Sequence, residues 1–379
     1  MYSDVISFIR SQFKSEEFIP LHAPFFGGNE KKYVIETIDS TFVSSVGKFV
    51  GLFEEQIRSY TGAKYAIAVV NGTAALHMAL ILGGIRKGDL VITQSLSFIA
   101  TCNAISYLSA DPLFIDVDKK TLGLSPHALE NYLCENTYQH NDECFDKQSS
   151  RRIKACVPMH TFGHPVEIDA IAEICKRFNI TLIEDAAESI GTLYKGLHTG
   201  TFGLIGAFSF NGNKTITCGG GGVIVTNDEK LGKLGKHLTT QAKVPHRWDF
   251  VHDHIGYNYR MPNINAALAC AQLEQIETFI SGKRELADSY KTFFENTELV
   301  FVNEPENARS NYWLNAVITK NLEDRNKFLT ELNDAGVMAR PCWQLMHHLK
   351  MFRNCIRDEQ QNAEWITERL VNIPSSFRA

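Results

Sequence analysis

Two ionisable side chains lie where apolar segments of the sequence end. Asp185 follows the strand-like run 181–184, and Lys214 follows the run 207–210 after a short polar turn. A lysine amine can form a Schiff base with an aldehyde. A carboxylate can keep a pyridine nitrogen protonated, so that the ring accepts electrons from an adjacent carbanion. These are the two groups that an enzyme dependent on pyridoxal 5'-phosphate (PLP) needs.

The motif Asn71-Gly72-Thr73 follows another apolar run and opens a predicted helix. A glycine lets the backbone approach a ligand closely, and the free N–H groups of a first helical turn can hold a phosphate together with the Thr73 hydroxyl. The same motif also occurs as a simple turn and helix cap. Taken alone, it is therefore compatible with both a phosphate site and a cap.

A second carboxylate, Glu188, stands three residues after Asp185. If a helical turn begins there, both side chains lie on one side, with Glu188 near the phenolic oxygen of the cofactor. Asp185 can instead cap the next helix, and two neighbouring carboxylates also suit a glycosidase pair or a metal site. The nearby lysine and the possible phosphate site favour the cofactor interpretation.

Lys214 is followed by four glycines at residues 219–222, which lack the Gly-Lys-Ser/Thr ending of a Walker motif. They predict a chain that turns closely past the lysine and keeps it away from solvent. Phe98, after the apolar run 90–93, can lay its ring on the cofactor or be ordinary core.

The histidines do not form a convincing metal site. His160 and His164 have a spacing that suits a helix, but Gly163 and the flanking prolines 158 and 165 argue against one, and no third ligand is apparent. A further group has irregular spacing: His246, His252 and His254. We expect no metal.

The predicted strands and helices that position these groups are typical of a doubly wound α/β domain. Short apolar runs alternate with amphipathic stretches, at residues 65–70, 90–93, 112–117, 153–158, 181–184, 206–210 and 222–226. Several are continuously apolar, which is typical of parallel strands covered by helices on both faces. In such sheets the ligand binds beyond the carboxyl ends of the strands, where the candidate residues fall.

The rest of the chain predicts a second, smaller α+β domain. A polar stretch at 135–152 is predicted to be a surface loop, and 264–290 a long helix. A strand at 312–318, a helix at 324–335 and a strand at 336–340 follow. We therefore divide the chain into an N-terminal segment (1–30), a large PLP-binding domain (31–260) and a small C-terminal domain (261–379).

Composition limits the possible partners. With 44% hydrophobic and 21% charged residues, the 379-residue chain is an ordinary globular protein. Its net charge of −5, with scattered basic residues, excludes a nucleic-acid surface. No apolar run is long enough for a membrane span and no signal peptide is visible, so we expect no membrane partner and a cytoplasmic location. Nine cysteines without a Cys-x-x-Cys pair indicate reduced, mostly buried thiols.

Taken together, the motifs resemble the DegT/DnrJ/EryC1/StrS family of sugar aminotransferases. The resemblance rests on segments 71–76, 97–101, 184–188, 208–210 with Lys214, and 256–261. It implies the aspartate aminotransferase-like fold (fold type I), with a large, mostly parallel sheet domain and a smaller α+β domain. It also implies PLP as cofactor, with pyridoxamine 5'-phosphate as its second form.

The resemblance also assigns roles to residues. Cofactor contacts would come from Gly72 and Thr73 at the phosphate, Phe98 on the ring, Asp185 at the pyridine nitrogen and Ser209 at the phosphate. Lys214 would be the Schiff-base lysine and, with Asp185, form the catalytic pair. Asn258 would reach the phosphate in the neighbouring subunit's site, which implies a homodimer with shared active sites.

Many relatives have glutamine where this chain has Glu188. Glu188, the segment 340–347 and the segment before Pro20 resemble a subgroup that aminates C4 of UDP-4-keto-6-deoxy-N-acetylglucosamine with L-glutamate as donor. The family's dehydratases replace the lysine by histidine, so Lys214 favours transamination. The alternatives are a C3 aminotransferase on another nucleotide keto sugar, a PLP-dependent sugar dehydratase, and a non-enzymatic binding module on a degenerate cofactor fold.

Overall fold

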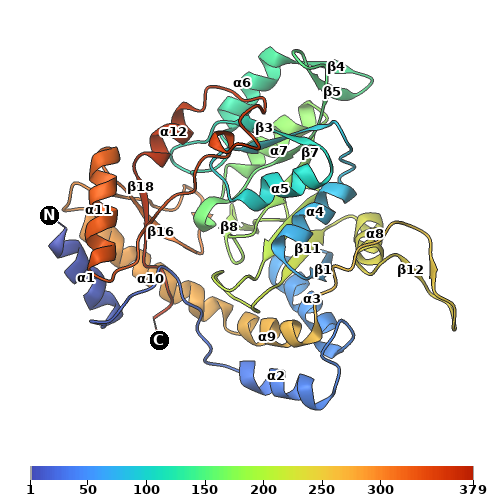
Figure 1. Cartoon of the computed structure of the whole chain (residues 1–379), viewed down its shortest axis with the longest axis horizontal. Coiled ribbons are helices and arrows are strands. Elements are labelled where there is room, and N and C mark those ends of the chain that lie inside the picture. Colours follow the sequence, from blue (N-terminus) through green and yellow to red (C-terminus); the bar gives the residue numbers. More distant parts are fainter. Residues whose placement is uncertain (1, 379) are drawn as a thin grey trace.

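The computed structural model describes residues 2–378 and centres on a nine-stranded sheet (Figure 1). Its main path runs in the order β1-β11-β10-β7-β6-β2-β3. These strands are β1 (Tyr65–Val69), β2 (Leu90–Gln94), β3 (Asp111–Ile115), β6 (Arg152–Val157), β7 (Thr181–Asp185), β10 (Ile205–Ser209) and β11 (Gly222–Thr226). Each apolar run singled out in the sequence forms one of them, which confirms the α/β class.

The sheet is mostly parallel but not entirely. The pairs β2–β3, β2–β6, β6–β7 and β7–β10 are parallel, whereas β11 runs antiparallel to both β10 and β1. The link from β10 to β11 contains turns and no helix. Because a parallel pair needs a long crossover, usually through a helix, this link can only return the chain antiparallel.

Helices cover both faces of this sheet. Alternate residues of β11 show the division: Val223 and Val225 pack with α3 (Lys48–Thr61) and α9 (Asn263–Leu273), and Ile224 packs with α4 (Gly72–Leu82) on the other face. The remaining covering helices are α5 (Ile99–Tyr107), α6 (Pro126–Asn136), α7 (Ile168–Arg177) and α8 (Glu229–Thr239). Continuous apolar runs are therefore required, because each strand is buried on both sides.

The polar stretch predicted to be a loop is instead a β-hairpin, so that prediction is wrong. β4 (Thr137–His140) pairs with β5 (Glu143–Asp146), and β5 adds to the start of β6. Asn141 and Asp142 form the two-residue turn with positive φ angles of 49° and 59°. Asn and Asp tolerate this conformation, which tight hairpins require.

The predicted long helix 264–290 is also corrected, because two helices occupy this region. α9 ends at Leu273 and α10 (Ile276–Phe294) begins three residues later. The Gln275 N–H bonds to the Gln272 carbonyl, three residues back, which tightens the turn between them.

A second, antiparallel sheet follows in the order β14-β16-β18-β17. Its strands are β14 (Val300–Phe301), β16 (Asn315–Ile318), β17 (Arg340–Pro341) and β18 (Leu370–Ile373), with helices α11 (Leu322–Asp334) and α12 (Gln361–Thr367). The predicted strand 312–318 and helix 324–335 are present with shifted ends. The strand predicted at 336–340 is reduced to β17, although Val337 forms an isolated bridge with Ile19.

The ends of the chain and several short elements complete the fold. α1 (Ser3–Phe13) joins a core cluster with α10 and α11, and α2 (Glu30–Asp39) packs on α9. Short strands form a three-stranded sheet, β8 (Leu193–Tyr194), β9 (Leu197–His198) and β15 (Ala308–Arg309). β12 (Lys243–Val244) and β13 (Val251–His252) form a hairpin that projects from the body of the molecule (Figure 1). The predicted domain boundaries stay a prediction.

All nine cysteines are free thiols, and most are buried, as the sequence predicts. Within residues 2–378, none of the helices combines the length and the apolar character that crossing a bilayer needs.

Candidate active site

A cavity of about 310 Å³ lies at the carboxyl ends of β7 and β10. Its lining includes all but one of the predicted site residues: Gly72, Thr73, Phe98, Asp185, Glu188, Ser209 and Lys214. The cavity is large enough for a small organic ligand. The positions of these residues in the sequence are far apart, so the strand order is what brings them together.

Asp185 ends β7 and is almost fully buried, with 2% of its surface exposed. Its carboxylate accepts hydrogen bonds from the Thr101 hydroxyl (2.6 Å) and from the Ala187 N–H (3.2 Å). Burial raises the pKa of Asp185, and the Thr101 hydrogen bond opposes that rise. No cation contacts this carboxylate among the described residues. A buried carboxylate needs such a partner, and a protonated ring nitrogen in the cavity would supply it.

Lys214 and Glu188 form an ion pair inside the cavity. The Lys214 Nζ lies 3.2 Å from Glu188 Oε1, and the two side chains are 11% and 2% exposed. The lysine is thus largely removed from solvent, as predicted. The other Glu188 oxygen accepts a hydrogen bond from the Phe162 N–H (2.9 Å). Burial raises the pKa of Glu188, and the adjacent lysine opposes this. Glu188 reaches the lysine from a turn rather than from the helix that the sequence suggested.

The amino terminus of α4 fits closely against β10. Asn71 caps this helix, because its side chain accepts a hydrogen bond from the Ala74 N–H (2.8 Å). The Thr73 side chain is therefore not needed as the cap. A Cβ atom on Gly72 would lie 2.7 Å from the Ser209 Cβ, so only glycine permits this approach. The arrangement leaves the first turn of α4, Thr73 and Ser209 on the cavity wall, where they could hold an anion.

Aromatic side chains form part of the cavity wall. Phe98 is 49% exposed, so the interpretation of this residue as ordinary core is wrong. Its ring centroid lies 6.3 Å from that of Trp343, and Trp313 lies over Lys214 with its ring centroid 3.9 Å from Nζ. The sequence gives no sign that Trp313 belongs to the site. It lies in a predicted strand of the second sheet, without a recognisable motif.

Asn258 is the one predicted site residue outside this cavity. It is exposed, and its side chain accepts a hydrogen bond from Arg260 (3.4 Å). Its main chain forms a bridge with Thr240, next to the projecting hairpin.

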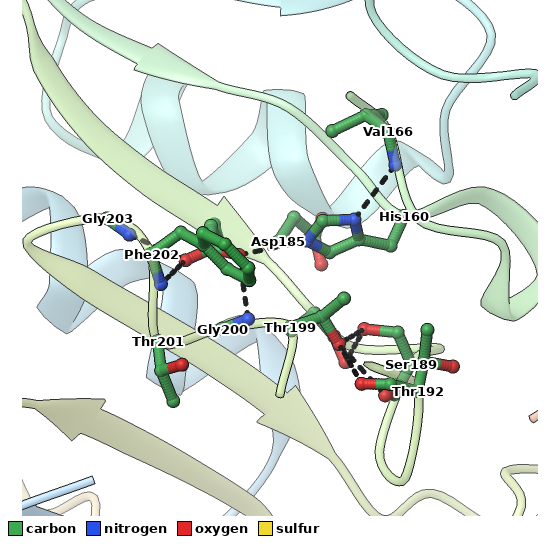
Figure 2. A network of polar contacts seen from close by, with 12 residues as sticks. His160, Val166, Asp185, Ser189, Thr192, Thr199, Gly200, Thr201, Phe202 and Gly203 are labelled. Carbon is green, nitrogen blue, oxygen red and sulfur yellow. Dashed lines mark hydrogen bonds and ion pairs between the residues drawn. The ribbon is translucent and has the colours of Figure 1, made fainter. Parts of the chain in front are cut away.

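A third buried carboxylate, Glu184, lies beside Asp185 on the opposite face of β7, because side chains alternate along a strand. Its Oε1 accepts hydrogen bonds from the N–H groups of Phe202 and Gly203, both at 2.7 Å. Its Oε2 accepts one from the Gly200 N–H (2.7 Å) and lies 3.1 Å from His160 Nε2. Figure 2 shows His160 and the turn 199–203 close to the end of β7, where Asp185 is labelled.

The hydrogen bonds of His160 fix its tautomer. The Val166 N–H donates to Nδ1 (3.3 Å), so the ring proton is on Nε2 and points to Glu184 (Figure 2). All four hydrogen-bond partners of Glu184 among the described residues then donate to its carboxylate oxygens. Both nitrogens of His160 are used, which leaves none for a metal.

His164 does not share a site with His160. Its two ring nitrogens are buried and have no hydrogen-bond partner within residues 2–378, and its ring packs edge-on against Tyr312. Burial lowers the pKa of His164 to about 4, so the ring is neutral. His254 belongs to the second histidine group noted in the sequence. Its ring contacts the Asp253 carboxylate, and the ring of His237 contacts the same carboxylate.

The fold and the cavity define an aminotransferase of the aspartate aminotransferase-like class, and comparison with known proteins specifies the family. Residues 25–378 match the model of the DegT/DnrJ/EryC1/StrS aminotransferase family, and the chain belongs to that family. It is a PLP-dependent sugar aminotransferase.

Similar proteins cover nearly the whole chain. A GDP-perosamine synthase of Escherichia coli O157:H7 is 40% identical over 359 residues, 95% of this chain and 93% of that protein. The putative pyridoxal phosphate-dependent aminotransferase EpsN of Bacillus subtilis is 38% identical, covering 88% and 84%. The structure of PseC, an aminotransferase of pseudoaminic acid biosynthesis from Helicobacter pylori, superposes with a TM-score of 0.85 at 23% identity, covering 94% of each chain.

The residues in the cavity fit PLP. Asp185 is a buried carboxylate that contacts no cation within residues 2–378, Lys214 presents an amine, and Gly72 leaves the close approach that a phosphate cradle requires. When bound, PLP supplies an electron sink for a carbanion beside the transferred nitrogen. These residues would hold its ring nitrogen, its aldehyde carbon and its phosphate.

We predict that Glu184→Gln destabilises the protein even without cofactor. An amide places an NH₂ group where one carboxylate oxygen now accepts backbone N–H groups, so at least one buried donor loses its acceptor. We expect a loss of about 3 kcal/mol in the free energy of unfolding, measured by urea denaturation of the cofactor-free protein.

The matched control is Glu173→Gln, an exposed glutamate on α7, which should change stability by less than about 0.5 kcal/mol. If both variants unfold at the same urea concentration as the unmodified protein, Glu184 does not hold the turn 200–203.

Proposed function

We propose that this chain transfers an amino group from L-glutamate to C4 of a nucleotide-linked 4-keto-6-deoxy sugar. The observation that carries the proposal is the buried Lys214–Glu188 pair beside Asp185, because transamination needs an amine that can hold and release a proton within a dry cavity. The similarity to a protein named GDP-perosamine synthase supports the sugar class. Perosamine is a 4-amino-4,6-dideoxy sugar, so its amine stands at C4.

The nucleotide is the part of the proposal that the sequence does not fix. Glu188, the segment 340–347 and the segment before Pro20 predict UDP-4-keto-6-deoxy-N-acetylglucosamine. The name of the relative at 40% identity points to a GDP-linked sugar instead, and none of the relatives described above is named for a UDP sugar. We therefore propose GDP-4-keto-6-deoxymannose as substrate and retain the UDP sugar as the competing substrate.

Each half of the reaction requires the same proton movements in opposite order. Lys214 would take the proton from the carbon that carries the donor nitrogen and would return a proton when the sugar is aminated. Glu188, 3.2 Å from Nζ, would keep the amine inside the cavity between these transfers. Asp185 would hold the ring nitrogen through its free lone pairs, while Thr101 and Ala187 fix its orientation.

We also propose that the active form is a homodimer in which Asn258 completes the partner's site. The hairpin β12–β13 projects from the body of the molecule (Figure 1). The hairpin and the residues just after it expose large apolar side chains. Trp248, Phe250 and Ile255 are 70%, 81% and 85% exposed. Apolar side chains this exposed are typical of a protein–protein contact.

We predict a particle of twice the 42.6 kDa chain mass in light scattering. Trp248→Ser with Phe250→Ser should shift it toward monomer and lower cofactor affinity, because the Asn258 contact is then lost. A fully active monomer would contradict the shared site.

We predict that Lys214→Ala still binds PLP but forms no covalent link and loses turnover by more than about a thousandfold. Borohydride treatment followed by mass spectrometry should label the unmodified protein at Lys214 and leave the variant unlabelled.

Asp185→Asn is the contrasting variant. It should keep the covalent label but slow both halves of the reaction, because the ring nitrogen loses its anionic partner. Normal turnover of Lys214→Ala would refute the assignment.

We predict that the sugar half-reaction distinguishes the nucleotides. The enzyme is first converted with excess L-glutamate and desalted, and each keto sugar is then added while the visible absorption of the bound cofactor is followed. GDP-4-keto-6-deoxymannose should restore the original spectrum at least about tenfold faster than the UDP sugar, a ratio that a few pocket contacts can produce.

Faster recovery with the UDP sugar would reverse the nucleotide assignment. No recovery with either sugar would show that the proposed keto-sugar substrate is wrong, although the glutamate half-reaction would stand.

A further inference from the structure

Trp313 makes two contacts with the turn that carries Lys214. Its ring centroid lies 3.9 Å from the Lys214 Nζ, and its indole N–H donates a hydrogen bond to the Asn213 carbonyl (2.6 Å). Trp313 is 4% exposed and lies two residues before β16 of the second sheet. A side chain from the segment that leads into the second sheet thus contacts the reactive amine and the residue before it.

We propose that Trp313 is a positioning residue for Lys214, and that Lys283 and Asn311 fix the main chain of Trp313 so that its ring stays over the amine. The inference rests on the proposed role of Lys214 in proton transfer. It adds to that role a residue from the segment that leads into the second sheet, which controls where the amine lies.

The ring face suits this task because an aromatic ring attracts an ammonium group. Glu188 Oε1 lies 3.2 Å from Nζ and the indole face 3.9 Å, so the amine is held between an anion and a ring. A lysine side chain has four rotatable bonds, and without such contacts its amine would sample many positions. The ring therefore restricts Nζ to the cavity, where its proton is used.

Asn311 ties Trp313 to the turn that carries Glu188. The Asn311 Oδ1 accepts a hydrogen bond from the Trp313 N–H (2.8 Å). Its Nδ2 donates to the carbonyls of Glu188 and Ile190, both at 2.9 Å. The fully buried side chain of Asn311 thus links the two residues that contact the Lys214 amine, Glu188 and Trp313. Neither of them can therefore shift alone.

Lys283 holds the other side of the Trp313 peptide. It lies on α10, is 1% exposed, and donates to the carbonyls of Trp313 (3.2 Å) and Ser375. Neither partner is an anion, and burial lowers the pKa of Lys283 to about 7. Both the charged and the neutral amine have enough N–H groups for two carbonyls. Lys283 therefore connects α10, the C-terminal strand region and Trp313 at either protonation state.

Trp313 also packs in a core cluster with Leu314, so a purely structural role is the alternative. That role predicts that substitution lowers stability without changing the chemistry of Lys214. Positioning predicts that the Lys214 amine itself becomes more reactive to reagents when the ring is removed. The two roles can therefore be separated in protein that contains neither cofactor nor sugar.

The test is competitive acetylation of the cofactor-free protein with trace acetic anhydride, with each lysine quantified by mass spectrometry. In Trp313→Met, which fills space but lacks the ring, acetylation of Lys214 should rise by about tenfold, within the roughly 2- to 30-fold that a cation–ring contact allows. Trp313→Phe keeps a ring face and should stay within about threefold of the unmodified protein.

The matched control is Trp365→Leu, because Lys119 lies over the Trp365 ring at 4.4 Å and neither residue lines the cavity. This variant should leave Lys214 unchanged. An unchanged Lys214 in Trp313→Met, or equal increases in the Met and Phe variants, would overturn the proposal.

Lys283→Met gives an independent test with Trp313 intact, and it replaces Trp313→Met if that variant does not fold. Acetylation of Lys214 should rise by several-fold, whereas Lys291→Met, an exposed lysine on the same helix, should have no effect. With cofactor restored, Trp313→Met and Lys283→Met should each lower kcat of the glutamate half-reaction by about tenfold and leave KM nearly unchanged.

A rise in KM alone would contradict positioning of the amine. Because the acetylation readout needs no substrate, its failure is distinct from failure of the proposed function, which Lys214→Ala tests directly.

Discussion

The structure depends on burying three carboxylates within five residues at the end of β7, with one lysine nearby. Glu184, Asp185 and Glu188 are each at most 3% exposed. Each is stabilised differently: Glu184 by three backbone N–H groups and His160, Asp185 by Thr101 and one N–H, and Glu188 by Lys214. The segment carries excess negative charge, which favours a ligand with a protonated nitrogen beside Asp185.

The chain around these carboxylates adopts unusual backbone conformations that place hydrogen-bond donors next to them. Phe162, whose N–H bonds to Glu188, has a φ of 57°, and Gly200, whose N–H bonds to Glu184, has a φ of 86°. A Cβ on Gly200 would also lie 2.6 Å from the Phe208 ring. Left-handed backbone is costly for a residue such as phenylalanine, so the buried anions account for a conformation that local sequence preferences disfavour. The turns behind the sheet are therefore consequences of the site's charge.

The sequence predicted the strands and the reactive pair because both have local signals. Continuous apolar runs mark the seven strands of the main sheet path, and Asp185 and Lys214 stand out as charges beside such runs. Sequence patterns failed in two other situations. The hairpin β4–β5 is local, but its turn residues Asn141 and Asp142 stand in a mostly polar segment without a continuous apolar run. The antiparallel direction of β11 and the exposure of Phe98 depend on tertiary pairing and packing, which periodicity does not encode. Trp313 carried no signal, because its neighbours in the sequence are ordinary core residues.

The origins of the cavity residues explain why the reaction class is easier to predict than the substrate. Asp185 and Ser209 end strands of the large sheet and Gly72 begins α4, and their motifs identify the cofactor. Trp313 and Trp343 come from the C-terminal third, where sequence patterns are weak, and they line the same cavity. A substrate that reaches Lys214 in this cavity therefore lies beside walls formed partly by these tryptophans. Differences in this region can therefore change the accepted substrate while the proton-transfer residues, fixed to the large sheet, stay as they are.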